Sequence, residues 1–349
     1  MNKIFNLIDK LSAFHSLSID EYVYLLENRT EEARLYLKNK ATEARKSVYG
    51  NSVYVRGLIE ISNICKNNCY YCGIRAENPN CQRYRLSVDE IFSCCEAGYE
   101  LGFRTFVLQG GEDGYYTDGV LIPLIKKIKA SFPDCAVTLS LGERSKESYQ
   151  ALFDAGVNRY LLRHEAVNSE LYGKLHPNNM SLEDRLQCLN DLKEIGYQVG
   201  CGFMVGAPFQ MTRHIAEDLK FIEEFGPHMC GIGPFIPHKD TIFNNENKGS
   251  AELTCYLLSI IRVMHPRILL PATTALGTVD ADGREQGVLS GANVIMPNLS
   301  PESVRKKYDI YDNKLSSGAE SAEKLNELKI RMQNIGYKIT VDKGDWKGN

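Results

Sequence analysis

Three cysteines lie within eight residues of one another, Cys65, Cys69 and Cys72, in the pattern C-x3-C-x2-C with Tyr71 before the last. Three thiolates this close together in the chain can ligate a single inorganic centre. A four-iron cluster takes one ligand per iron, so three cysteines leave one iron open. An open iron can bind the amino and carboxylate groups of a small molecule. The spacing therefore predicts a [4Fe–4S] cluster that does more than carry electrons.

Two other interpretations of the cysteine pattern remain open. A structural zinc site pairs C-x2-C with a second pair of cysteines or histidines, but Cys81 stands alone downstream and Cys94 and Cys95 are adjacent. Chance clustering is the second alternative.

The chain has 11 cysteines, an odd number, and its first ten residues lack the apolar run of a secretion signal. We therefore expect a cytoplasmic protein whose other cysteines are ordinary thiols rather than a disulfide framework.

Short apolar runs alternate with helix-like stretches from Arg56 onward. Continuous apolar runs are typical of strands covered on both faces, as in parallel sheets. The predicted strands are Gly57–Ser62, Thr105–Gln109, Ala136–Leu141, Arg159–His164, Gln198–Met204, Cys230–Phe235, Arg267–Pro271 and Ala292–Met296. The predicted helices are Glu31–Lys46, one that begins after Ser87, Leu121–Ser131, Lys146–Ala155, Leu182–Ile195 and Ile215–Phe225. Ser18 with Glu21, and Ser87 with Glu90, have the spacing of capping boxes.

This alternation predicts an α/β fold of the (β/α)8 TIM-barrel type, which is about 250 residues long. An open doubly wound sheet is the alternative. We expect a helical segment at 1–50, the barrel at 51–300, and a C-terminal segment at 301–349 that packs on it. Chemistry in such barrels takes place at the carboxyl ends of the strands, where the cysteine motif lies.

The composition excludes several classes of protein. Of the 349 residues, 43% are hydrophobic and 24% charged, and the net charge is only -3. These values are typical of a soluble globular protein. Nucleic-acid binding and membrane-surface binding usually require a concentrated basic face, so neither partner is expected.

The cysteine motif resembles the hallmark of the radical S-adenosylmethionine (SAM) superfamily. Gln109-Gly110-Gly111-Glu112, at the end of the next predicted strand, is similar to the GGE motif of that superfamily, whose backbone holds the methionyl amino group of SAM. Within the superfamily the chain resembles the HydE family of [FeFe]-hydrogenase maturases, relatives of biotin synthase and methylornithine synthase. This resemblance runs from about Val53 to Asn298, with Tyr160 to Glu165 and Gly231 to His238 as its most discriminating stretches.

The resemblance implies a complete barrel that binds a [4Fe–4S] cluster and SAM. Glu165 would bond the ribose of SAM, Arg185 would pair with its methionyl carboxylate, and Met229 would border the adenosyl end. Thr138 and Arg163 would lie inside the barrel near the substrate, and Tyr308 and Tyr311 would approach from the C-terminal segment. The substrate would be an organometallic iron precursor made by the partner maturase HydG, or another small molecule, and contacts with other maturases and an electron donor would be transient.

The residues themselves support part of this assignment. Arg163 and Glu165 alternate along a strand and so share a face; if that face is buried, both charges need partners. A ligand could supply them, and so could a simple salt bridge between the two. His164 would then point outward as a structural residue. The polar residue Thr138 on an apolar strand carries no signal of its own.

Two further expectations concern related chemistry. Some HydE proteins bind a second cluster through C-terminal cysteines, but this chain has no cysteine after Cys255. The alternative enzymes are a methylornithine-synthase-like mutase and a biotin-synthase-like enzyme that inserts sulfur. The latter would need further cluster ligands inside the barrel, for which the candidates are Cys135, Cys188, Cys201 and Cys230. A non-catalytic iron–sulfur carrier would not need Gly111, Glu112 or Glu165.

Overall fold

The computed structural model describes residues 3–316 and 318–348, so that the outermost residues of the two expected terminal segments lie outside it. The strands are β1 (Ser52–Val55), β2 (Gly57–Ser62), β3 (Thr105–Gly110), β4 (Ala136–Ser140), β5 (Arg159–Leu161), β6 (Gln198–Cys201), β7 (Met204–Val205), β8 (Met229–Cys230), β9 (Gly233–Pro234), β10 (Val294–Ile295) and β11 (Lys338–Thr340). The helices are α1 (Lys3–Phe14), α2 (Ile19–Glu27), α3 (Glu31–Tyr49), α4 (Val88–Glu100), α5 (Asp118–Ser131), α6 (Lys146–Asp154), α7 (Ser169–Leu175), α8 (Leu182–Ile195), α9 (Thr212–Phe225), α10 (Ala251–Met264), α11 (Thr274–Val279), α12 (Gly283–Leu289), α13 (Glu302–Arg305) and α14 (Leu325–Asn334), with short 3-10 turns at Gly318–Glu320 and Ala322–Lys324.

The strands form a closed ring of parallel pairings. The largest sheet has the order β2-β3-β4-β5-β6-β8. Beyond β8, Met229 pairs with Leu269, and Pro271 pairs with Val294 of β10. Val294 in turn pairs with Tyr54 of β1, and Leu58 of β2 pairs with Asn298. The ring therefore returns to its first strand, which confirms the predicted barrel and rules out the open sheet.

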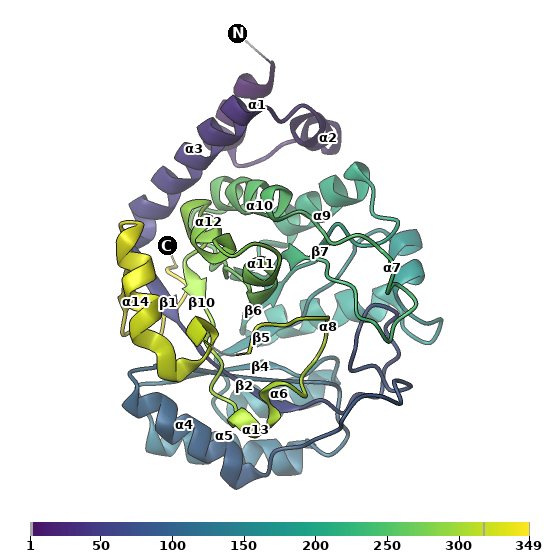
Figure 1. The fold of residues 1–349 in the computed structure, drawn as a ribbon, viewed down its shortest axis with the longest axis vertical. Helices are drawn as coiled ribbons and strands as arrows, with labels where there is room; N and C mark the ends of the chain where they lie inside the picture. Colours follow the sequence, from purple (N-terminus) through teal and green to yellow (C-terminus); the bar gives the residue numbers. More distant parts are fainter. Residues whose placement is uncertain (1–2, 317, 349) are drawn as a thin grey trace.

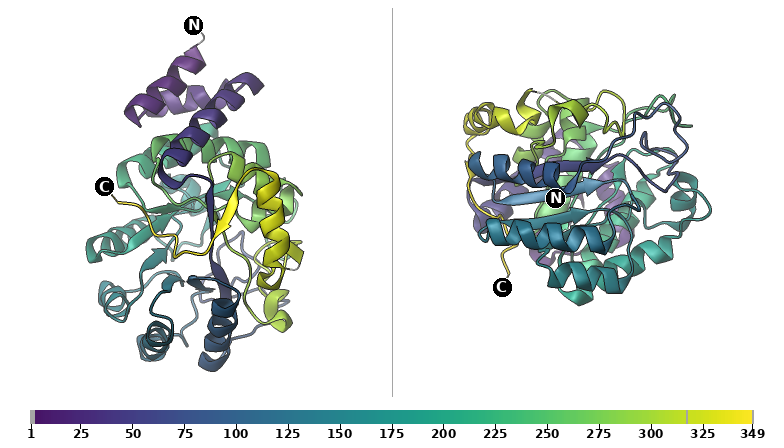
Figure 2. Two further views of the ribbon diagram at one scale, coloured as in Figure 1. Left: turned by 90° about the vertical axis from the view of Figure 1, so that its left-hand side faces the viewer. Right: turned by 90° about the horizontal axis from the view of Figure 1, so that it is seen from below.

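Helices surround the ring of strands on its outer side (Figures 1 and 2). Every residue of β2 is buried, because the barrel interior covers one face and helices such as α4 cover the other. Both predicted capping boxes are present, at Ser18 with Glu21 and at Ser87 with Glu90. They satisfy backbone N–H groups that the first turn of a helix leaves without partners.

Several elements differ from the sequence prediction. The strands expected at 198–204 and 230–235 are each divided in two, and the segment expected as a strand at 267–271 makes only isolated bridges. The strand expected at 159–164 ends at Leu161, because the chain leaves the ladder before Arg163 and turns sharply at Glu165. The sequence analysis did not predict α10, whose residues from Tyr256 to Met264 are all buried. This helix lies between the barrel and α3 and so lacks the polar face by which surface helices are recognised.

Both terminal segments pack on the outside of the barrel, and they meet where the Arg45 guanidinium of α3 lies over the ring of Tyr337. Helices α1 to α3 stand together at one end of the molecule, with α3 along α10 and α2 against α9 (Figure 1). At the other terminus, β11 adds to β1 in parallel register, with Val53 opposite Ile339. Within the described residues, every helix is too short or too polar to cross a membrane.

Candidate active site

A cavity of about 350 Å³ opens at the carboxyl ends of the barrel strands. It brings together residues that are far apart in the sequence, from the loop after β2 to the segment after α13. The predicted site residues that line it are Tyr71, Cys65, Cys69, Cys72, Gln109, Gly110, Gly111, Glu112, Arg163, Glu165, Arg185, Tyr308 and Tyr311.

The three motif cysteines are free, half-buried thiols in the loop that follows β2. Burial raises the pKa of each, that of Cys72 to about 12. The pKa of Cys69 is raised by burial and then by the negative charges that Cys72 and Cys65 would carry. Three thiolates at these positions would repel one another, so the bare protein favours the protonated thiols. The positive charge of a metal centre compensates that repulsion, and coordination therefore deprotonates the thiols.

The Gly-Gly-Glu stretch at the end of β3 packs directly against the cysteine loop. A Cβ on Gly111 would lie 2.3 Å from the Ile64 carbonyl oxygen, so only glycine permits this approach. The Glu112 N–H donates to Cys65 Sγ at 3.4 Å. The Glu112 side chain occupies the space beside Gly142, whose φ is +74°, and accepts from the Glu143 N–H. The motif thus ties two strand ends to the cysteine loop.

Arg163 and Glu165 face each other across the cavity wall. Arg163 Nη2 lies 3.2 Å from Glu165 Oε2, but the two are not aligned for a hydrogen bond. In the described part of the chain, Arg163 Nε and Nη2 and Glu165 Oε2 are buried without a hydrogen-bond partner. A buried charged group left in this way costs free energy, so the pair is suited to binding a polar ligand.

Arg185, on α8, reaches the same wall. Its Nε is 2.6 Å from Glu143 Oε1, and its Nη1 donates to the Arg163 carbonyl oxygen. Burial alone would lower the pKa of Arg185, but Glu143 and nearby tyrosines raise it well above its usual value. The guanidinium is therefore a permanent cation beside the cysteine loop, where an anionic group of a ligand would be stabilised.

Tyr71, inside the cysteine motif, is held by a residue that the sequence analysis missed. Its hydroxyl lies 3.3 Å from His176 Nε2, and His176 Nδ1 lies 2.9 Å from the Tyr172 carbonyl oxygen. Burial lowers the pKa of His176 to about 4, so the ring is neutral near pH 7. In that form Nδ1–H donates to the carbonyl and Nε2 accepts from the Tyr71 hydroxyl.

Two predicted site residues do not line the cavity. Thr138 is buried on β4, and its hydroxyl has no hydrogen-bond partner within the described residues. Met229 lies at the opposite end of the barrel, where it packs with Tyr54 and Leu269 and its sulfur accepts from Arg56. The structure therefore does not bring Met229 to the position expected for the adenosyl end.

A buried ion pair that the sequence did not predict forms part of the cavity wall. Lys314 Nζ lies 2.6 Å from Glu60 Oε1, and both side chains are nearly inaccessible to solvent. Asn298 Nδ2 donates to the other Glu60 oxygen. The charge of Glu60 within an otherwise apolar strand was a visible signal, whereas Lys314 lies in an irregular segment with no signal. That segment passes over the ends of the strands (Figure 1) and also supplies Tyr308 and Tyr311.

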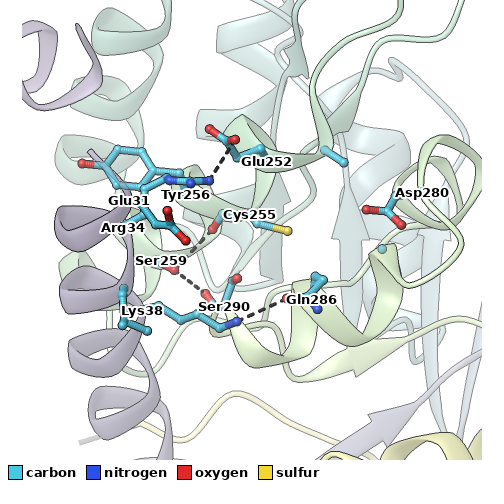
Figure 3. A pocket seen from close by; sticks show the side chains of 13 residues that line it. Glu31, Arg34, Lys38, Glu252, Cys255, Tyr256, Ser259, Asp280, Gln286 and Ser290 are labelled. Atoms are coloured by element: carbon cyan, nitrogen blue, oxygen red, sulfur yellow. Dashed lines mark hydrogen bonds and ion pairs between the residues drawn. The ribbon is translucent and has the colours of Figure 1, made fainter. Parts of the chain in front are cut away.

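A second hollow, of about 390 Å³, lies outside the barrel between α3, α10 and α12 (Figure 3). Two of its cations have partners within the hollow: Arg34 pairs with Glu252 at 2.8 Å, and Lys38 donates to the Gln286 side-chain oxygen. Burial raises the pKa of Cys255 there to about 11, which favours its protonated thiol near pH 7. The predicted site residues are all absent from the described lining of this hollow.

The residues of the barrel cavity fit a [4Fe–4S] cluster and SAM. Cys65, Cys69 and Cys72 would supply three thiolates, and the cluster, when bound with SAM, supplies the one-electron chemistry that breaks a carbon–sulfur bond. The unpartnered atoms of Arg163 and Glu165 and the cation of Arg185 would meet the polar groups of SAM. The absence of a side chain at Gly111 permits the close approach of the cysteine loop to the end of β3.

Comparisons with known proteins agree with this site. Residues 59–222 match the family model described as the Radical SAM superfamily. The chain is 46% identical over 275 residues to the [FeFe] hydrogenase maturase subunit HydE of Thermotoga maritima, covering 79% of this chain and 78% of that protein. It is 28% identical to 3-methylornithine synthase of Methanosarcina acetivorans, over 94% and 92% of the two chains.

The solved structures give the same picture of the fold. The crystal structure of methylornithine synthase (PylB) superposes with a TM-score of 0.83 at 25% identity and covers 96% of this chain and 97% of that one. The cysteine motif lies inside residues 59–222, which match the family model. The chain is a radical SAM enzyme with a [4Fe–4S] cluster and SAM as its cofactors, and it belongs to the HydE family of that superfamily.

Proposed function

We propose that this enzyme acts in the maturation of the [FeFe]-hydrogenase active site, on a small or organometallic iron substrate held inside the barrel. The observation that carries this proposal is the 46% identity to a HydE maturase over most of both chains, combined with a cavity that joins the cluster cysteines to a separate polar wall. Contacts with other maturases and with an electron donor, and a cytoplasmic location, belong to the same proposal.

In this proposal each group of residues has one task. Glu165 binds the ribose of SAM, Arg185 stabilises its carboxylate, and the backbone at Gly110 to Glu112 holds its amino group. Arg163, Tyr308 and Tyr311 bind and orient the substrate, with Thr138 beneath them. The segment after α13 covers the cavity and excludes water, which protects a reactive intermediate. Because the cofactor performs the difficult step, the substrate-binding residues need no general base.

The likeness to methylornithine synthase supports a second candidate, a mutase that acts on an amino acid. Sulfur insertion has less support. Along the described lining of the cavity the cysteines are the three of the motif, while Cys201 and Cys230 lie buried and side by side on β6 and β8.

The test is an oxygen-free maturation assay with unmatured hydrogenase, the other maturases, a reductant and SAM. Addition of the wild-type enzyme should produce hydrogenase activity, and addition of the Cys72→Ala variant should not. The same enzyme should give no methylornithine when it is supplied with amino acids and SAM. Cleavage of SAM with a rearranged amino acid, and without hydrogenase activity, would establish the mutase instead.

A further inference from the structure

The backbone at Glu165 is strained. Its φ is +64°, a left-handed conformation that glutamate rarely adopts and that persists only where surrounding contacts enforce it. The strain falls on a residue whose carboxylate lines the cavity. Immediately after it, the Ala166 N–H donates to the His164 carbonyl oxygen at 2.8 Å, which makes a very tight turn.

Gly202, which directly follows β6, and Asp218, on α9, hold this turn from outside the cavity. The Glu165 N–H donates to the Gly202 carbonyl oxygen at 3.0 Å, and the Gly202 N–H donates to His164 Nδ1 at 3.3 Å. Asp218, on α9, accepts from the Val167 N–H at 2.8 Å. Contacts before and after Glu165 therefore fix its backbone to β6 and α9.

His164 and Asp218 also interact with each other. His164 Nε2 lies 3.3 Å from Asp218 Oδ1. Since Nδ1 accepts from Gly202, a neutral ring carries its proton on Nε2, facing the carboxylate. The hydrogen bond from Gly202 thus assigns one tautomer to His164, whose Nε2 lies at ion-pair distance from Asp218 without the alignment of a hydrogen bond.

The pair is fully buried, and neither residue lines the cavity. His164 packs against Phe203 and Phe221, with ring centroids 6.0 and 4.8 Å away. Burial raises the pKa of Asp218. For packing alone, apolar residues of similar volume would stabilise the fold as well as a buried polar pair. We therefore explain the presence of this pair by its contacts with the backbone on either side of Glu165, at Gly202 and Val167.

We propose that His164 and Asp218 are positioning residues that fix Glu165 in the orientation in which it binds SAM. This inference rests on the proposed role of Glu165. It assigns to His164, which the sequence marked only as structural, and to Asp218, which no motif marked, an effect on cofactor affinity.

The test compares SAM binding in wild-type enzyme and in Asp218→Asn, His164→Phe and Glu165→Gln. Asparagine keeps one oxygen at the position of Oδ1, which faces both the Val167 N–H and His164 Nε2, but removes the negative charge of Asp218. Phenylalanine fits the aromatic surroundings of His164 without ring nitrogens. The affinity is read from the change that SAM causes in the EPR signal of the reduced cluster. Glu224→Gln is the matched control, because this carboxylate lies on the same helix and is 68% exposed.

Asp218→Asn and His164→Phe should each weaken SAM binding about tenfold, the lower end of what is lost when partners that orient a binding residue are removed. KM for SAM should rise while kcat for 5′-deoxyadenosine at saturating SAM stays close to that of the wild type, as expected when an interaction contributes equally to ground and transition states. The double variant Glu165→Gln/Asp218→Asn should bind SAM no more weakly than Glu165→Gln alone, because coupled residues are not additive.

Two results would overturn the inference in distinguishable ways. If both variants bind SAM like Glu224→Gln and lose only resistance to urea, while Glu165→Gln binds weakly, the pair is structural. If Glu165→Gln itself binds SAM like the wild type, the role proposed for Glu165 fails, and the positioning role fails with it.

Discussion

At the scale of single residues, Cys72 and Cys81 offer a matched pair. Both are half-buried thiols, but only Cys72 lines the cavity; Cys81 lies beside Asn63, with Nδ2 3.5 Å from its sulfur. Cys72→Ala should abolish the four-iron cluster because it leaves two ligands, whereas Cys81→Ala should keep it. Iron and sulfide content after anaerobic reconstitution measures both. An intact cluster in Cys72→Ala would remove that residue from the ligand set.

Asp113 gives a prediction about pH. Burial alone would raise the pKa of this carboxyl, but hydrogen bonds from Arg85, Ser62 and the Tyr115 N–H lower it below its ordinary value of 3.8. A lowered pKa means that the native state favours the charged form. The stabilisation is therefore complete above about pH 4 and is lost as the pH falls through the folded-state pKa.

The measurement is urea unfolding of the cluster-free protein between pH 6 and pH 3, run in parallel on the wild type and Asp113→Asn. The variant should be less stable at pH 6, and the gap should narrow as the pH falls below 4. A gap that does not change with pH would show that the Asp113 charge contributes nothing.

The site was predictable from sequence where chemistry demands particular residues at fixed spacing. The three cysteines belong to that group, whereas Gly111 and Glu165 were expected in the cavity through the family resemblance. Lys314 and His176 were not predictable, because each acts through a partner that only folding brings near. The partner of Lys314 is Glu60, 254 positions away along the chain. The partner of His176 is Tyr71, 105 positions away. Met229 was misplaced because it begins β8 and lies before Gly231, the first residue of this stretch to line the cavity. The sequence does not show which end of the barrel a given residue faces.

At the scale of elements, the capping box of α4 is a local unit that can be tested alone. The Ser87 hydroxyl accepts from the Glu90 N–H, and the Glu90 carboxylate accepts from the Ser87 N–H. Ser87→Ala should lower the free energy of unfolding by about 1 kcal/mol, measured by urea denaturation. Ser93→Ala, at an exposed position within the same helix, should cost nothing, since alanine is the better helix former. Equal effects of the two changes would contradict the assignment.

Elements with local signals were predicted well and elements without them were not. The bounds of α8 and β2 match the prediction residue for residue, since caps, glycines and apolar runs define their ends. β11 could not be predicted, because it is a strand only through its pairing with β1. The helix α10 was missed for a similar reason, as the contact with α3 removes its polar face.

At the scale of the whole molecule, the C-terminal tail closes the base of the barrel. Arg159, inaccessible to solvent, pairs with Asp345, and its guanidinium also donates to the Lys343 carbonyl oxygen. Asp345→Asn should lower the free energy of unfolding by about 1–2 kcal/mol, because it leaves a buried guanidinium without its carboxylate. The loss is limited because the Asp345 side chain is 47% exposed, so that water compensates in part.

Asp20→Asn is the matched control for this tail contact, because Asp20 pairs with Arg213 at the surface, where both side chains are more than half exposed. Exposed pairs contribute little, so this change should leave the unfolding transition in place. A fall in stability of similar size in both variants would contradict the view that the tail holds the base of the barrel.

The central claim is that the barrel cavity binds a cluster with an open iron that reduces SAM. The most direct measurement is the EPR spectrum of the reconstituted, dithionite-reduced enzyme with and without SAM, with 5′-deoxyadenosine measured in the same samples. The account predicts a four-iron signal that changes when SAM is added, and 5′-deoxyadenosine that disappears in Cys72→Ala. A site that holds zinc, or a cluster whose signal does not respond to SAM, would contradict it.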